Sequence, residues 1–416
     1  MANSDTEVVI VGGGAAGIAA GRRLAKAAID CLVVEARARL GGRAWTVTGA
    51  SGYALDLGCG WLHSADRNPW APIVAQQGRT IDKSLPPWKK PSLPAGFPPA
   101  EQADFGRAQN AFFERLEAAA QSGSDVAAAS LLEPGCRWNN LISAVGTYIS
   151  GGELARVSAR DFDNYADTGI NWRVVEGYGA AIAAHGEGLA LALDCPVLQI
   201  DHSGRRLKIE TAKGVITADQ AIVTLPSAVI ADKEFLFTPA LPEKTESARG
   251  LPLGLADKLF LALEGANEFE TDTRAFGRID RSATATYQFR PLGRPLIEVY
   301  FGGRLPAELE AEGESAFFAF AVSELTGLFG GDFARRVKPL HMHCWGADPF
   351  ARGSYSYALP GRADCRGKLA APVNDRLFFA GEACSAIDFS TAHGGYLSGV
   401  AAADQVIAAR QRKRVG

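Results

Sequence analysis

Short runs of apolar residues near the N-terminus predict a strand, a helix and a second strand. Residues 7–11 form a β-branched run, residues 15–28 are rich in small helix-forming side chains, and residues 31–36 form another apolar run. Two such runs with a longer helix-forming stretch between them are typical of a βαβ unit, whose strands lie parallel in one sheet. The chain therefore begins with part of a parallel sheet.

A different pattern predicts a second, antiparallel sheet. Residues 85–100 hold six prolines and predict irregular backbone, and the period of the apolar residues over 101–121 predicts an amphipathic helix. A helix is also predicted over 314–329. Three runs alternate apolar and polar residues, as half-exposed antiparallel strands do. They lie at 257–263, 284–290 and 295–301.

The first sheet is predicted to resume twice further along the chain. Strand-like runs with turn residues between them occupy 196–229, and a buried-strand pattern at 376–380 precedes a Gly- and Ala-rich helix over 394–410. The chain thus leaves the first sheet and returns to it.

We therefore predict an α/β protein with two interleaved domains. A Rossmann-like domain with the βαβ unit at its N-terminus would comprise residues 1–78, 178–252 and 350–416. An α+β domain, with a mostly antiparallel sheet and helices, would comprise residues 79–177 and 253–349.

Composition excludes several classes of protein. Among 416 residues, 43 Lys and Arg against 46 Asp and Glu give a net charge of −3, which argues against a nucleic-acid surface. The seven cysteines form no CxxC pair, so neither a disulfide framework nor a zinc site is supported. We find no signal peptide and no run near the roughly 18 apolar residues that span a bilayer. We expect a cytoplasmic protein that binds neither nucleic acid nor a membrane.

A glycine motif lies between the first predicted strand and helix. Gly12, Gly14 and Gly17 form G-x-G-x-x-G, which permits a tight turn and brings backbone N–H groups close to a pyrophosphate. Glu35 ends the second strand, where a carboxylate accepts hydrogen bonds from both ribose hydroxyls. Together these features predict a dinucleotide site.

The next segment favours FAD over NAD. Gly41 and Gly42 form a second flexible pair, while Arg37 and Arg43 supply fixed donors for phosphates and the ribityl region. We therefore expect FAD as the cofactor.

Four segments together resemble the flavin-containing amine oxidase family of monoamine and polyamine oxidases. They are E-A-R-A-R-L-G-G-R-A-W-T from Glu35, D-L-G-C-G-W-L-H from Asp56, F-A-G-E from Phe379 and T-A-H-G-G-Y-L-S-G from Thr391. The resemblance covers residues 7 to about 410 and is thin between 90 and 150. It implies an FAD-binding domain joined to a substrate-binding domain.

The resemblance also assigns cofactor residues. Val197 would present its backbone to the adenine, Glu382 would meet the ribityl or pyrophosphate region, and Trp61 would lie near the flavin ring. The full cofactor set predicted from the motifs and the resemblance is Gly12, Gly14, Ala16, Gly17, Glu35, Arg37, Gly41, Gly42, Arg43, Gly60, Trp61, Val197, Gly381, Glu382 and Tyr396.

Three catalytic residues are implied in the same way. Lys258 matches a family lysine that is bonded through water to flavin N5, and we expect burial to depress its pKa. Tyr355 and Tyr396 match two aromatics that face the flavin and would form a cage around the substrate nitrogen. Ser354 stands where covalent members of the family carry a flavin-linked cysteine, so FAD is expected to be noncovalent.

Substrate contacts are expected from Trp61, His63 and Trp345, the last of which precedes Tyr355 by ten positions. Acidic residues along a polyamine tunnel are candidates as well, namely Asp161, Asp163, Asp167 and Glu176. We expect no metal site, although His341 and His343 alternate, because neither carboxylate nor cysteine partners accompany them.

The implied reaction is oxidation of an amine to an imine by hydride transfer to flavin N5, followed by reduction of O2 to H2O2 and hydrolysis of the imine. Polyamines or other alkyl or aralkyl amines are the expected substrates. No arginine can be assigned from the sequence as the carboxylate clamp that an amino-acid oxidase needs. A flavin desaturase or dehydrogenase with another electron acceptor and a non-catalytic flavoprotein remain as alternatives. The sequence does not determine the oligomeric state, and a homodimer is among the possibilities.

Overall fold

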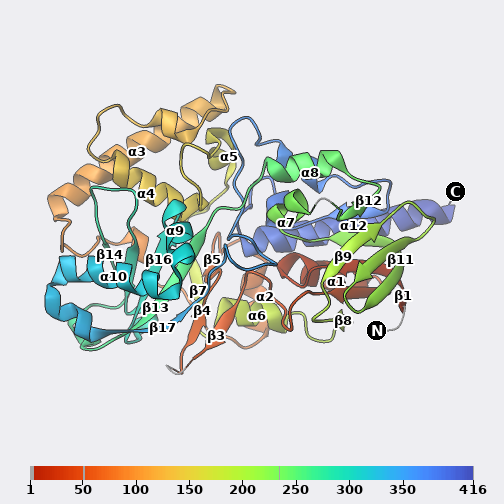
Figure 1. Cartoon of the computed structure of the whole chain (residues 1–416), viewed down its shortest axis with the longest axis horizontal. Coiled ribbons are helices and arrows are strands. Elements are labelled where there is room, and N and C mark those ends of the chain that lie inside the picture. The colour runs from red at the N-terminus through yellow and green to blue at the C-terminus, as the bar shows by residue number, and fades with distance from the viewer. Residues whose placement is uncertain (1–3, 50–51, 234, 416) are drawn as a thin grey trace.

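The structure is a computed structural model that describes residues 4–49, 52–233 and 235–415. It is a mixed α/β protein with two main sheets, which lie in opposite halves of the molecule (Figure 1). One sheet lies near both chain termini, and the other lies among helices from the middle of the chain.

The first sheet has eight strands in the order β12-β9-β10-β11-β1-β2-β8, and β18 also pairs with β11. Strands β1, β2, β8, β11 and β18 pair in parallel, whereas β9, β10 and β11 form an antiparallel meander. The strands are β1 (Ser4–Val11), β2 (Cys31–Val34), β8 (Leu191–Ala192), β9 (Val197–Asp201), β10 (Leu207–Thr211), β11 (Gly214–Val223), β12 (Phe237–Thr238) and β18 (Leu377–Phe379).

Two long helices cover one face of this sheet. Helix α1 (Ala15–Lys26) packs against α12 (Ala392–Val415), and side chains of both join the core formed by Val8 and Ile10 of β1. The two helices approach closely because residue 399 is Gly399. A Cβ at this position would lie only 2.1 Å from the Ala16 carbonyl oxygen. Both ends of the chain thus support the same face of the sheet. The shorter helices of this half are α2 (Trp70–Gln76), α6 (Tyr178–Ala184), α7 (Ser227–Asp232), α8 (Pro242–Arg249) and α11 (Cys365–Ala370).

The second sheet is antiparallel throughout, in the order β14-β15-β16-β13-β17. One face of the sheet is buried against α10 (Glu314–Phe329) and α9 (Arg304–Glu312). Strands β15 and β16 show the predicted alternation, but β13 is buried on both faces because it is an inner strand with the second cavity and its helices on the other side. The opposite face carries polar and charged side chains toward the centre of the molecule. The strands are β13 (Ala256–Leu263), β14 (Thr273–Phe276), β15 (Thr286–Phe289), β16 (Leu296–Gly302) and β17 (Val337–Met342).

Three helices stand over the polar face of the second sheet, and the sequence analysis assigned only one of them. The predicted helix over 101–121 is α3 (Pro99–Gln121), whereas α4 (Asn139–Ser150) and α5 (Ala159–Asn164) fall in a stretch that it left unassigned. All three share a core with Phe276 of β14.

The remaining elements are short. A three-stranded sheet joins β5 (Trp61–Leu62), β7 (Trp172–Val174) and β6 (Ile81–Asp82), and β3 (Thr46–Thr48) pairs with β4 (Ala54–Asp56). Single 3-10 turns occur at Pro87–Lys89, Ala128–Leu131, Ala266–Glu268, Pro291–Gly293, Gly331–Arg336 and Glu382–Cys384.

A buried ion pair joins the two halves of the molecule. Arg366 of α11 binds Asp161 of α5 through two hydrogen bonds, Nε to Oδ1 at 2.6 Å and Nη2 to Oδ2 at 2.8 Å. Both side chains are almost fully buried, at 2% and 1% exposure. The guanidinium also lies over the Phe389 ring at 3.7 Å. Because each charge is removed from water, each depends on the other.

We expect Asp161→Asn to destabilise the protein by about 3–5 kcal/mol, because it leaves the Arg366 guanidinium buried without a counter-ion. Thermal and urea denaturation measure the change. Asp332→Asn, which breaks an exposed pair with Arg335, is the control and should leave the midpoint unchanged. The double variant with Arg366→Met should recover part of the loss. Equal midpoints for Asp161→Asn and Asp332→Asn would show that the buried pair contributes little.

Candidate functional site

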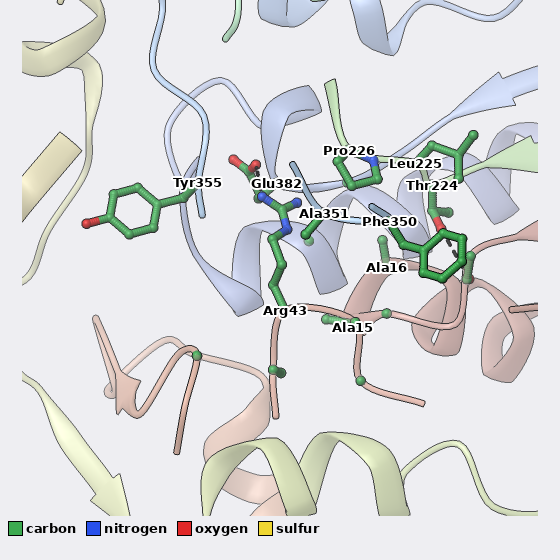
Figure 2. A pocket seen from close by; sticks show the side chains of 18 of the residues that line it. Ala15, Ala16, Arg43, Thr224, Leu225, Pro226, Phe350, Ala351, Tyr355 and Glu382 are labelled. Carbon is green, nitrogen blue, oxygen red and sulfur yellow. Dashed lines mark hydrogen bonds and ion pairs between the residues drawn. The ribbon is translucent and has the colours of Figure 1, made fainter. Parts of the chain in front are cut away.

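A cavity of about 650 Å³ opens at the carboxyl ends of β1, β2 and β11. We call it the first cavity. Its wall comes from distant parts of the chain, and Figure 2 shows Arg43 reaching toward Glu382, with Tyr355 at one end and Phe350 near Thr224 at the other. Ligands of open α/β sheets bind at this edge of the strands.

The glycine loop forms one wall of the first cavity. Gly12 has φ of +109°, and a Cβ there would lie 2.5 Å from Thr224 Oγ1. Gly17 does not line the cavity; a Cβ on it would lie 1.9 Å from the Gly12 carbonyl oxygen, so its part is to let α1 pack against the loop. Two of the three motif glycines, Gly12 and Gly14, therefore face the cavity.

Glu35 is held at the end of β2 with 4% exposure. Its carboxylate accepts hydrogen bonds from the Gly13 N–H at 2.7 Å and from the Arg37 N–H at 2.9 Å. The Arg37 side chain in turn binds Asp348 at 2.5 Å and lies over the Phe350 ring. The predicted acid and the two loops thus form one connected wall.

Glu382 anchors the opposite wall but has no acceptor site left for a ligand. Its two oxygens accept hydrogen bonds from Arg43 Nη1, the Ser356 N–H and hydroxyl, and the Ser390 N–H. A carboxylate offers about four such sites. Burial alone would raise the pKa of Glu382, but the Arg43 guanidinium and the Ser356 hydroxyl hold it below its usual value. Glu382 lines the first cavity and holds the Arg43 guanidinium in place.

A second cavity, of about 950 Å³, lies between the polar face of the second sheet and helices α3 to α5. The first and second cavities meet, because seven residues line both. These shared residues are Trp61, His63, Lys258, Tyr300, Tyr355, Ser390 and Thr391.

Lys258 lies on β13 at this junction and is 6% exposed. Its Nζ donates to Glu298 Oε1 at 3.1 Å and to the Asp56 carbonyl oxygen at 3.2 Å. Burial alone would lower the pKa of Lys258, yet Glu298 and Asp56 raise it above its ordinary value. The expectation of a depressed pKa was wrong, because β16 supplies a carboxylate that the sequence did not reveal. The charged ammonium retains a third N–H beyond these two bonds.

His63 presents a neutral imidazole at the junction. Its Nδ1 lies 2.7 Å from Asn171 Oδ1, and because that oxygen can only accept, Nδ1 carries the proton. Burial lowers the pKa of His63 and keeps the ring uncharged. Nε2 is then a hydrogen-bond acceptor.

Tyr355 and Tyr300 form a hydroxyl pair beside Lys258. The Tyr355 hydroxyl donates to the Tyr148 carbonyl oxygen at 2.7 Å and lies 2.9 Å from the Tyr300 hydroxyl. Tyr300 was missed by the sequence analysis, because it faces Lys258 only through the register of β16 against β13.

Tyr396 and Trp345, two further predicted site residues, do not line the second cavity. Tyr396 lines neither cavity and packs edge-on against Trp70 at 5.1 Å, whereas Ala392 and Gly395 of α12 line the first cavity. Thr391, just before α12, lines both cavities instead. Trp345 lines only the first cavity, with Nε1 donating to the Leu57 carbonyl oxygen, and not the second.

The other predicted residues that line the first cavity are Gly14, Ala16, Arg37, Gly41, Gly42, Gly60, Val197 and Gly381.

The acidic candidates for the tunnel divide into three groups. Asp163 and Asp167 line the second cavity with exposed side chains. Asp161 also lines it, but its charge is paired with Arg366. Glu176 lines neither cavity and accepts a hydrogen bond from the Thr80 N–H.

Comparison with protein families identifies the chain. Residues 15–407 match the model of the flavin containing amine oxidoreductases. The chain belongs to this family. Members of the flavin amine oxidoreductase family bind a flavin and oxidise amines, and this chain is an amine-oxidising enzyme of that kind. In the part of the chain that the structure describes, no helix has the length and apolar character needed to cross a membrane.

Several relatives of this flavin amine oxidoreductase align over almost the whole chain. Polyamine oxidase 4 of Oryza sativa subsp. japonica is 28% identical over 99% of this chain and 90% of its own length. Polyamine oxidase 2 of Arabidopsis thaliana is 27% identical over 97% of this chain and 88% of its own length. A solved structure of redesigned putrescine oxidase has a TM-score of 0.75 at 16% identity and covers 98% of this chain and 99% of its own, which shows a shared fold.

We expect Tyr355→Phe and Tyr396→Phe to differ in their effect on amine oxidation. The first removes a hydroxyl bonded to Tyr300 and Tyr148 at the junction of the cavities, and should lower kcat/KM about tenfold, or about 1.4 kcal/mol. The second alters a ring outside both cavities and should leave kcat/KM unchanged. Steady-state peroxide assays on both variants check this, and a larger loss for Tyr396→Phe would contradict the placement.

Proposed function

We propose that this protein is an FAD-dependent oxidase of alkyl, aralkyl or polyamines that releases an imine and hydrogen peroxide. The observation that carries the proposal is the junction of two cavities at Lys258, Tyr300, Tyr355 and His63. A long nucleotide-type cavity and a separate large cavity meet at one charged and three neutral polar side chains. This arrangement lets a cofactor ring and a substrate approach each other away from bulk water.

The first cavity suits FAD in its chemistry. Gly12, Gly14 and Glu35 would hold the diphosphate and ribose of the adenosine half, and Arg43 would lie along the phosphate and ribityl region. The Val197 backbone would contact the adenine. When bound, the flavin accepts two electrons from the amine carbon and passes them to O2.

Noncovalent binding is supported by the side chains around this cavity. The Ser354 hydroxyl is committed to the backbone of Ala256, donating to its carbonyl at 2.8 Å and accepting from its N–H at 2.9 Å. Burial raises the pKa of Cys59 to about 12, so this cavity-lining thiol stays protonated and weakly nucleophilic.

The residues at the junction position the substrate rather than act as a strong base. The neutral His63 Nε2 accepts a hydrogen bond from the substrate amine, and the rings of Tyr300 and Tyr355 limit its orientation. The charged Lys258 remains beside the cofactor end, where it favours the negative charge that develops as oxygen is reduced. Deprotonation of the incoming amine is left to solvent and substrate.

The purified protein is expected to be yellow and to release FAD, not FMN, on acid precipitation. A panel of spermidine, spermine, putrescine, tyramine, benzylamine and amino acids, assayed for peroxide, tests the reaction. Anaerobic bleaching of the flavin band by an amine, with no peroxide in air, would favour a dehydrogenase or desaturase. A protein that cannot be reconstituted with FAD, or that no amine reduces, would overturn the proposal.

Lys258→Met should slow reoxidation of the reduced flavin by O2 about tenfold to a hundredfold, because the ammonium that stabilises developing negative charge is lost. Stopped-flow measurement of the oxidative half-reaction checks this, and the anaerobic reductive half-reaction should change less. The double variant Lys258→Met with Glu298→Gln controls for the carboxylate left unpaired in the single variant. Unchanged reoxidation in both variants would exclude this role for Lys258.

A further inference from the structure

One arginine on the wall of the second cavity carries no anionic partner. Arg274 lies on β14 and lines this cavity, as do Phe276 on the same strand and Thr286 and Gln288 on β15. Side chains alternate along a strand, and the intervening Ala275 is buried on the opposite face against the core of α10. The position of Arg274 is therefore set by the pleat of the sheet.

The guanidinium of Arg274 is unpaired among the residues that the structure describes. Its Nε is buried there and has no hydrogen-bond partner. Burial lowers the pKa of Arg274 to about 10, opposed only by Tyr148, and no carboxylate contributes. Four other arginines near the two cavities bind a carboxylate, namely Arg37, Arg43, Arg173 and Arg366.

Aromatic rings shape the space around this guanidinium. Arg274 lies over the Phe276 ring at 4.6 Å, and Phe276 meets Phe105 of α3 edge-on at 6.4 Å. Stacking covers one face of the planar group, while its N–H donors lie in its plane and stay available at the edge. Such an edge is suited to a carboxylate, which it binds through two parallel hydrogen bonds.

Strand register places Arg274 far from the junction. Lys258 pairs with Tyr300, Tyr300 with Thr286, and Thr286 with Phe276, which is three steps across the sheet. Arg274 lies two residues further along β14. With strands about 4.8 Å apart and about 3.4 Å per residue, the Cα atoms of Lys258 and Arg274 are separated by about 16 Å.

The carboxylates of the second cavity lie elsewhere. Glu114 and Glu117 follow Phe105 on α3 by nine and twelve residues, which is roughly 13 and 18 Å along the helix. Glu298 is already paired with Lys258, and Asp161 with Arg366. Asp163 interacts electrostatically with Glu117, and Asp167 with His63, while no carboxylate of the described residues acts on Arg274. The end of the cavity at Arg274 therefore has a positive charge, and the exposed carboxylates are grouped at another part of the lining.

We propose that Arg274 binds a carboxylate at the far end of the substrate, so that the enzyme oxidises a long amine with a terminal carboxylate. This inference rests on the proposed function and narrows its substrate class. An α-amino acid does not fit, because its carboxylate is one carbon from the amine, whereas Arg274 lies across the cavity from the junction. The reacting amine lies at Lys258 and Tyr355, and the chain runs over the polar face of the second sheet.

The test compares ω-aminoalkanoates of increasing chain length with the n-alkylamines of equal length. The wild-type enzyme should prefer the carboxylates at longer chain lengths. Arg274→Gln should lower kcat/KM for these about tenfold to a hundredfold, as expected for a lost charged hydrogen bond. Its kcat/KM for the alkylamines should fall much less, because they carry no carboxylate. Arg274→Lys keeps the charge but lacks the two parallel N–H donors of a guanidinium. Its kcat/KM for the carboxylates should lie between those of the wild type and Arg274→Gln.

Arg278→Gln is the matched control, because Arg278 is an exposed arginine of the same region, paired with Asp280 and outside the cavity lining. It should match the wild type on both series. No preference for carboxylates in the wild type, or an equal loss on alkylamines in Arg274→Gln, would overturn the inference.

Binding of decanoate, a carboxylate that cannot be oxidised, separates this inference from the proposed function. Calorimetry on the FAD-loaded protein should show binding that Arg274→Gln weakens about tenfold or more. That result supports the carboxylate site even if no amine is oxidised, in which case the proposed function alone fails. Equal decanoate affinity in the wild type and in Arg274→Gln would overturn the inference. Peroxide production from amines would still support the proposed function in that case.

Discussion

A continuous chain of buried charges and hydroxyls holds the two halves of this molecule together and fixes the cofactor wall. Asp161 of α5 pairs with Arg366, Arg366 donates to Ser356, Ser356 donates to Glu382, and Glu382 holds Arg43. Because buried charges are costly unless paired, none of these groups can move alone. The position of the Arg43 guanidinium in the first cavity therefore depends on a carboxylate in the helical region over the second sheet.

The second sheet in turn sets how the first and second cavities lie relative to each other, because its strands line both. The second sheet gives one face to the core of α10 and the other to the second cavity. That second face presents Lys258 and Tyr300 at the junction and Arg274 at the far end. The sheet thereby separates the junction, where we propose that oxidation takes place, from the proposed carboxylate site at Arg274 by a distance that strand spacing sets.

Some of the site was predictable because its residues act within short segments. The glycine loop, Glu35 and the Gly41–Gly42 pair lie within one βαβ unit and the turn after it, where spacing alone determines which residues face the first cavity. Tyr396 lines neither cavity although its motif matches, because a motif gives the position of a residue in the chain and not the direction of its side chain in the packed molecule. Tyr300 and Arg274 could not be found from the sequence. Only pairing between strands places Tyr300 beside Lys258 and Arg274 at the far end of the second cavity.

The sequence by itself determined the α/β architecture and the glycine loop, because hydrophobic period and glycine spacing are local properties of the chain, and the resemblance of four segments indicated the family. The tertiary structure decided the charge state of Lys258, the occupied oxygens of Glu382 and the unpaired guanidinium of Arg274. The first two depend on which partners folding brings within hydrogen-bond distance, and those partners lie between 8 and 339 positions away in the chain. Burial and pairing are properties of the packed molecule, so they appear only after the strands and helices have met.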